Sequence, residues 1–171
     1  MLYTGALNDR LDVRLIDEVT AALPEVVFEF VGPTAPTFAP VRRANLVVQD
    51  AVAHDAIPAL LRRATAVWLP YRNAPNQAHI GAPLKFFEAL IAGNLVVRPQ
   101  FLDVGVDAAA FARGASTTDE WVRSLQWALA PHAALRDSAI AYARTQTYAQ
   151  RVRDQVDVLA PLVEQRRRHA H

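Results

Sequence analysis

A short segment in the middle of the sequence combines the residue types that bind phosphate groups. Gly81 is followed by Pro83, Lys85 and Glu88. Proline suits the first position of a helix because its missing N–H would have no partner there, and this places Lys85 in the first turn. The positive end of a helix dipole disfavours a cation by about 0.3–1 kcal/mol, so a lysine there makes sense if an anion binds. We therefore predict that backbone N–H groups after Gly81 and the Lys85 ammonium together hold a phosphate.

Glu88 lies one turn after Lys85, on nearly the same face of the predicted helix. A carboxylate at this place can accept hydrogen bonds from two hydroxyl groups of a ribose. The same spacing fits an ordinary ion pair between Lys85 and Glu88 on a helix surface equally well. Lys85 is the only lysine in the sequence, and arginine stands at every other position counted as lysine or arginine.

Composition and missing motifs exclude several other kinds of site. Cysteine is absent, which excludes a disulfide framework, a thiolate metal site and a cysteine nucleophile. The patterns of P-loop NTPases, nicotinamide-binding domains, serine hydrolases and zinc proteases do not occur, nor does the D-x-D motif of metal-dependent sugar transferases. We therefore expect no metal and no cofactor. A net charge of +1 provides no field to attract nucleic acid.

Short apolar runs alternate with amphipathic stretches along the sequence. The apolar runs, which we expect to be strands, cover residues 2–5, 26–31, 46–48, 66–69 and 95–97. The amphipathic stretches, which we expect to be helices, cover residues 13–23, 57–64, 83–92, 108–113, 118–130, 133–144 and 148–163. Gly93 is placed to end the third helix in the left-handed conformation. Apolar strands separated by helices predict a parallel sheet with helices on both faces.

The predicted fold class is therefore α/β, with one Rossmann-like doubly wound domain over residues 1–165. We expect five to six strands and a helical C-terminal end. Ligands of such sheets bind outside the carboxyl ends of the strands, where Gly5, Gly32 and residues 70–81 fall. The sequence has no run of 18 apolar residues and no secretory signal pattern, so we expect a cytoplasmic protein. We expect the basic tail, residues 166–171, to be disordered, with at most peripheral contact with the inner membrane face.

Residues 81–97, G-A-P-L-K-F-F-E-A-L-I-A-G-N-L-V-V, resemble the donor-site motif of group 1 glycosyltransferases of the GT-B fold. The resemblance extends to Y-T-G-A-L at 3–7, which is similar to the first strand and glycine loop of their C-terminal domain. Weaker similarities cover residues 30–33, 60–71 and 148–151. The resemblance implies that the chain is the C-terminal half of a GT-B fold and binds a nucleotide-sugar donor without a metal.

Carried over by position, the resemblance also implies site residues. The diphosphate would be held by the turn made of Gly81, Ala82, Pro83, Leu84 and Lys85. Glu88 would hold the ribose hydroxyls, and Lys85 and Glu88 would be the catalytic pair, since stabilising the leaving diphosphate is the main work. Gly5 would let the first loop approach the phosphates, beside Arg10, while Pro70 and Tyr71 would line the base pocket. A plain strand-to-helix turn is an equal interpretation of Gly5, and core packing is favoured for Tyr71 and Trp68.

The sequence departs from the family in one position that bears on chemistry. Eight residues before Glu88, where the family has a glutamate that contacts the sugar, stands Ile80. Whether the transfer would retain or invert the sugar's configuration therefore stays open. His79 could supply a donor or acceptor in its place, although an exposed loop histidine is the favoured interpretation.

The resemblance covers one of the two domains that GT-B enzymes place around a cleft. The acceptor and its activation would belong to an N-terminal domain or a separate subunit, so we expect no sugar transfer by this chain alone. The last predicted helix carries an apolar stripe that could meet such a domain or mediate self-association: Tyr148, Val152, Val156, Leu159 and Val163. A stand-alone nucleotide-binding module and a degenerate half used for protein association remain alternative functions.

Overall fold

The computed structural model describes residues 1–74, 81–147, 149–150, 152–153, 156–157 and 159–161. Within these residues, six parallel strands form one sheet in the order β3-β2-β1-β4-β5-β6. The strands are β1 (Leu2–Thr4), β2 (Phe28–Val31), β3 (Leu46–Gln49), β4 (Ala66–Trp68), β5 (Leu95–Pro99) and β6 (Ala112–Ala115). This is the order of a Rossmann-like doubly wound sheet, as the sequence predicts.

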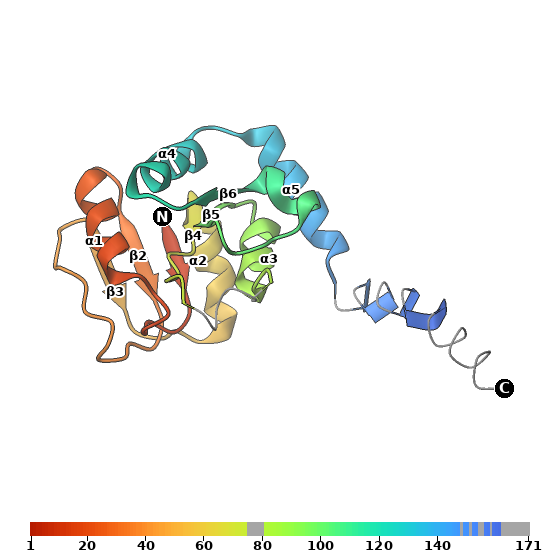
Figure 1. Cartoon of the computed structure of the whole chain (residues 1–171), viewed down its shortest axis with the longest axis horizontal. Helices are drawn as coiled ribbons and strands as arrows, with labels where there is room; N and C mark the ends of the chain where they lie inside the picture. The colour runs from red at the N-terminus through yellow and green to blue at the C-terminus, as the bar shows by residue number, and fades with distance from the viewer. Residues whose placement is uncertain (75–80, 148, 151, 154–155, 158, 162–171) are drawn as a thin grey trace.

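The helices cover both faces of the sheet (Figure 1). They are α1 (Val13–Ala22), α2 (Ile57–Arg63), α3 (Leu84–Ile91), α4 (Thr118–Leu129) and α5 (Ala133–Thr145), with short 3₁₀ helices η1 (His54–Ala56) and η2 (Val106–Phe111). Helices α1 and α4 pack against each other on one face, while α3 packs against α2 and α5 on the other. No helix in the described part of the chain is long and apolar enough to cross a membrane.

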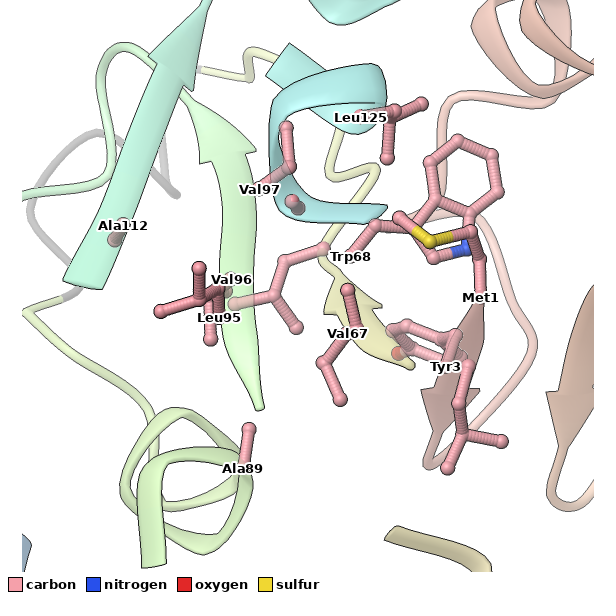
Figure 2. Close-up of a cluster of buried hydrophobic side chains, with 14 of the residues drawn as sticks. Met1, Tyr3, Val67, Trp68, Ala89, Leu95, Val96, Val97, Ala112 and Leu125 are labelled. Carbon is pink, nitrogen blue, oxygen red and sulfur yellow. The ribbon is translucent and has the colours of Figure 1, made fainter. Parts of the chain in front are cut away.

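The core lies between the sheet and these two helix layers. Val96 and Val97 of β5 are fully buried, as expected of a parallel strand covered on both faces. Figure 2 shows Ala89 of α3 and Leu125 of α4 closing on the central strands β4 and β5. Trp68 is also fully buried, with its ring centroid 6.2 Å from that of Trp121, so the core-packing interpretation of Trp68 is confirmed.

Two local features differ from the sequence-based expectations, and a third agrees with them. Residues 112 and 113 belong to strand β6 and not to a helix, and the turn before them is 3₁₀. The segment Ala112–Ala115 has no β-branched or aromatic residue, so its strand character comes from pairing with β5. Pro83 is the N-cap of α3 and does not occupy its first helical position, although Lys85 still lies in the first turn. Gly93, with φ of +79°, ends α3 as predicted.

The C-terminal segment lies partly outside the described residues. Residues 149–150, 152–153, 156–157 and 159–161 are helical, and the side chains of Val152, Val156 and Leu159 are each more than half exposed. Tyr148, Val163 and the predicted basic tail lie outside the described residues. The described part of the apolar stripe is therefore uncovered by this domain.

Candidate functional site

A hollow of about 180 Å³ lies at the point where the strand order of the sheet reverses. Strands β1 and β4 are neighbours in the middle of the sheet, and the chain continues from them to opposite edges. In sheets of this type the loops after two such strands diverge and leave a crevice for ligands. The residues that line it lie on β1, follow β1, β4 or β5, or stand at the start of α3: Tyr3, Ala6, Asn8, Arg10, Tyr71, Pro83, Lys85, Phe101 and Leu102.

The Lys85 side chain points into this hollow (here called the lysine pocket). Its Nζ donates a hydrogen bond to the Tyr3 hydroxyl at 3.1 Å and lies 4.3 Å from the centre of the Tyr3 ring. The Tyr71 ring is 5.7 Å away. Burial lowers the pKa of Lys85 from its ordinary 10.5 to about 8, against the raising effect of the Glu88 charge, while Arg10 lowers it further. The lysine is thus largely protonated at neutral pH but poorly solvated, a state that a bound anion would relieve.

Arg10 supplies a second cation to the lysine pocket from the loop after β1. Its backbone N–H donates to the Asn8 side chain at 3.1 Å, and its carbonyl accepts from the N–H of Arg72 at 2.8 Å. The second bond ties the loop after β1 to the loop after β4. The Arg10 side chain is exposed and free to meet a ligand, while its backbone is fixed.

Two glycines create the space that Lys85 occupies. Gly5 has φ of +128°, and a Cβ built there would collide with Nζ of Lys85. A Cβ on Gly32, at the end of β2, would collide with the Gly5 carbonyl. Gly32 therefore lets the first loop lie close to β2, and Gly5 lets the lysine cross over that loop. Gly5 therefore does more than form the turn between β1 and α1, because the lysine occupies the space that a side chain at this position would take.

Among the described residues, no side chain caps the backbone N–H groups at the start of α3. Pro83 is the N-cap residue and no acidic residue stands in the first turn. Of the predicted phosphate-binding turn, Pro83 and Lys85 line the lysine pocket, whereas Gly81, Ala82 and Leu84 do not. Gly81 and Leu84 are exposed, and Ala82 is half-buried. An anion at this end of α3 would meet the N–H groups of the first turn, the positive end of the dipole and the lysine.

Glu88 faces a different hollow from Lys85. This second hollow (here called the glutamate groove), of about 310 Å³, lies between α2 and α3. It is lined by His54, Ile57, Pro58, Leu61, Arg62, Glu88, Ile91 and Ala92. The ion pairs found among the described residues join Arg14 to Glu18 and Arg63 to Glu29. The alternative of an ion pair between Lys85 and Glu88 is therefore wrong, because the lysine turns toward Tyr3.

The two residues predicted to line the base pocket, Pro70 and Tyr71, lie in different surroundings. Tyr71 lines the lysine pocket, its ring edge toward Tyr3 at 6.3 Å between centroids, and burial raises its pKa to about 12. Pro70 is buried, and its carbonyl accepts the N–H of Asp12 at 2.8 Å, which positions the N-cap of α1. It does not line the pocket. His79 and Ile80 lie outside the described residues.

The sequence analysis did not name Tyr3 as a site residue. It stands in an apolar run that predicts a core strand, and only 2% of its surface is exposed, so its type and place suggest packing alone. The structure shows its hydroxyl bound to Lys85 and donating to the Ala6 carbonyl at 3.3 Å. Phe101 and Leu102 were also missed, although they follow a predicted strand at the carboxyl edge of the sheet. The rule that ligands bind at that edge could have found these two residues.

The sheet order, its helix layers and the lysine pocket at the reversal point define a Rossmann-like α/β domain. The sequence matches no protein-family model and no curated protein. Solved structures nevertheless share the fold, which is that of a Rossmann-like half of a GT-B glycosyltransferase.

One similar structure is WaaG, a glycosyltransferase involved in lipopolysaccharide biosynthesis. It is 21% identical with a TM-score of 0.64, and the alignment covers 85% of this chain and 42% of WaaG. Another is the UDP-forming α,α-trehalose-phosphate synthase from Burkholderia vietnamiensis, which is 11% identical with a TM-score of 0.64. That alignment covers 96% of this chain and 44% of the synthase. The chain thus spans less than half the length of these solved proteins.

Proposed function

We propose that this chain is the donor-binding domain of a glycosyltransferase and that its lysine pocket holds the diphosphate of a nucleotide-sugar. The observation that carries the proposal is the meeting of the Lys85 ammonium, the Arg10 side chain and the uncapped start of α3 at one hollow. These groups come from separate elements of the fold and all favour an anion. A phosphate oxygen would accept from the ammonium and from backbone N–H groups, as at other helix N-termini.

The nucleoside part of the donor would lie toward the glutamate groove. Glu88 is one helical turn from Lys85 and close enough that its charge raises the lysine's pKa, although it opens to the other hollow. A donor spanning the first two turns of α3 would place its diphosphate at Lys85 and its ribose hydroxyls at Glu88. The apolar wall of Ile57, Pro58 and Ile91 provides a surface against which the base can pack.

In sugar transfer, Lys85 would act on the leaving group. Negative charge grows on the diphosphate as the bond to the sugar breaks, and a fixed cation with backbone N–H groups stabilises that charge more in the transition state than in the bound substrate. None of the residues assigned here activates an acceptor hydroxyl. An N-terminal domain or a separate subunit would supply that step, and the exposed valines and leucine of the C-terminal helix offer it a contact.

The test is calorimetric titration of the protein with UDP, GDP and their sugar conjugates. Lys85→Met preserves the length of the buried stem and removes the charge. It should weaken binding by about 1.5–3 kcal/mol, roughly 10- to 150-fold, the range for a hydrogen bond to a charged group. Arg123→Met, which removes an exposed cation from α4, is the control and should bind normally.

The outcomes separate the three functions. Binding of any nucleotide-sugar that depends on Lys85 supports a donor domain or a stand-alone module. Sugar transfer that appears only when a partner chain is added singles out the donor domain. Absence of binding at millimolar ligand removes both and leaves a degenerate half used for association. Turnover by the purified monomer would refute the division of labour between two domains.

A further inference from the structure

The surroundings of the Lys85 ammonium are unusual because an aromatic side chain, and not a carboxylate, accepts its hydrogen bond. Tyr3 contributes both its hydroxyl, 3.1 Å from Nζ, and its ring face, 4.3 Å below Nζ. The Tyr3 hydroxyl in turn donates to the Ala6 carbonyl. A hydroxyl can donate its one proton to a carbonyl and still offer an oxygen lone pair to the ammonium. No ion pair of Lys85 is found among the described residues.

We propose that Tyr3 is a positioning residue for Lys85. The Tyr3 ring supports the Lys85 ammonium, and the Tyr3 hydroxyl directs it into the lysine pocket. The ligand side of this inference rests on the proposed function, whereas the arrangement of Tyr3 and Lys85 belongs to the free protein. The two can therefore be tested separately.

An aromatic partner suits a lysine that must later bind phosphate. A carboxylate in the place of Tyr3 would neutralise the ammonium and repel the incoming diphosphate. A ring face attracts a cation through its quadrupole, without carrying a net charge. A neutral hydroxyl adds one acceptor. Among the described residues, the ammonium is therefore held in place without an ion pair until an anion arrives.

The fold holds Tyr3 in place more firmly than it holds any loop residue of the pocket. Tyr3 is in the middle of β1, paired in register with Phe30 of β2, and the two ring centroids are 5.6 Å apart. The Tyr71 ring meets Tyr3 edge-on. The missing Cβ of Gly5 leaves the channel through which the lysine reaches the hydroxyl. The lysine thus enters from a helix, but its end point is set by the central strand of the sheet.

The charged and titratable groups around Lys85 come from each neighbouring element. They are Tyr3 on β1, Arg10 after β1, Tyr71 after β4 and Glu88 on α3. Tyr3 and Tyr71 both have a raised pKa because they are buried, so both are neutral below pH 10. Any titration of the pocket between pH 7 and 9 therefore belongs to the lysine, within the described residues.

The lone lysine makes the experiment direct. Protein labelled with ¹³C and ¹⁵N in lysine gives one side-chain signal set by NMR, which reports the protonation of Lys85 in the ligand-free protein. Tyr3→Phe preserves the ring and removes the hydroxyl. Since the charged form loses its acceptor, the titration midpoint of Lys85 should fall by about one pH unit. Tyr142→Phe, on α5, removes a hydroxyl that does not line the pocket and should leave the midpoint unchanged.

An unchanged midpoint in Tyr3→Phe would overturn the inference. A purely structural role of Tyr3 would lower the unfolding temperature without moving this titration. The wild-type protein offers a second measurement that needs no variant. Because the ammonium lies over the Tyr3 ring, the Hε protons of Lys85 should resonate upfield of their position in an unfolded peptide, and normal shifts would also overturn the inference.

Titration of both proteins with UDP at pH 8 separates the inference from the proposed function. Weaker binding by Tyr3→Phe, together with its lower midpoint, supports both. If neither protein binds UDP but the lysine midpoint still shifts, the donor-binding function fails and the positioning role of Tyr3 stands. If both bind UDP equally and the midpoints coincide, the function stands and the positioning role fails.

Discussion

Helices α3 and α4 both begin near the carboxyl edge of the sheet, but their first turns are built in opposite ways. Helix α4 satisfies its own N–H groups: Thr117 caps Glu120, and the Glu120 carboxylate accepts from the N–H groups of Ser116 and Thr117. These bonds lower the pKa of Glu120. Helix α3 has a proline at its N-cap, no acidic residue in its first turn, and a lysine instead.

Among the described residues, the first turn of α4 is thus capped by side chains of the chain itself, whereas the first turn of α3 has no side-chain cap. At α4 a carboxylate from the chain already occupies the place that an anion would take, so the helix is complete without a ligand. At α3 a cation adds to the positive end of the dipole, an arrangement that is unfavourable for the free protein. The chain thus forgoes a stabilising cap at α3 in the place where the fold has a hollow for a ligand. Changes at α3 should therefore alter binding, and changes at α4 should alter only stability.

Gly5→Ala should have the largest effect on that comparison. The new Cβ collides with the Lys85 ammonium, and alanine is strained at φ of +128°. We expect a loss of stability of about 1–3 kcal/mol from the backbone strain. We also expect UDP affinity to fall at least as far as in Lys85→Met, because the lysine is displaced from the pocket. Thermal unfolding and calorimetry measure the two effects.

Gly105→Ala is the matched control for Gly5→Ala. Gly105 also has a positive φ, +79°, but no atom lies within 4 Å of the place its Cβ would take. It should therefore show the strain and lose stability, yet bind ligand normally. If both glycine variants lost affinity equally, general destabilisation would explain the result and the role of Gly5 in making room for Lys85 would be wrong.

Glu88→Gln tests the division of the donor between the lysine pocket and the glutamate groove. A ribose hydroxyl would lose a charged acceptor, so UDP affinity should fall by about 1.5 kcal/mol, roughly tenfold. Pyrophosphate, which has no ribose, should bind as well as before or slightly better, since a neighbouring negative charge has gone. Titrating both ligands into both proteins checks this. An equal loss for the two ligands would place Glu88 at the phosphates and not at the nucleoside.

The pH dependence of binding should follow Lys85. The ammonium is the form that holds phosphate, and burial places its pKa at about 8 in the free protein. UDP affinity should therefore fall by up to about tenfold per unit above pH 8. The contribution of Lys85 to the stability of the free protein has the opposite slope: since its folded pKa is below the ordinary 10.5, the unfolded chain holds the lysine proton more fully between pH 8 and 10.5, and this contribution rises there.

Lys85→Arg is the control for the pH profile. A guanidinium stays charged throughout this range, so any affinity that it retains should no longer change between pH 7 and 10. If the wild-type affinity were flat to pH 10 as well, Lys85 would not be the group that meets the anion. Calorimetry at four or five pH values suffices for both proteins.

The fold was more accessible to sequence reasoning than the geometry of the site. Five apolar runs separated by helical stretches predicted the parallel sheet, and the segment around Lys85 predicted the helix whose start lies at its edge. Strand β6 was missed because Ala-Arg-Gly-Ala has no intrinsic strand preference and depends on its neighbour β5. Helical spacing put Lys85 and Glu88 on one face, but it could not show that two side chains of one helix face open into separate hollows. That depends on Tyr3, a residue 82 positions away in the sequence.

Thr117→Ala should have the smallest effect and complete the comparison from the side of α4. Removing the cap frees the N–H of Glu120 from its partner and should cost about 0.5–2 kcal/mol of stability. UDP binding should not change, because the Glu120 carboxylate already accepts from the N–H groups at the start of α4. The remaining Glu120 carboxylate still accepts from Ser116, and its pKa is lowered in the folded state. The contribution of the ionised Glu120 carboxylate to the stability of the folded protein is therefore present at neutral pH. It is lost as the pH falls through the folded pKa of Glu120, in a window below the ordinary value of 4.5. Urea unfolding at pH 7 and pH 3 measures the change in the free energy of unfolding. A change of UDP affinity in Thr117→Ala would show that the starts of α3 and α4 are not independent.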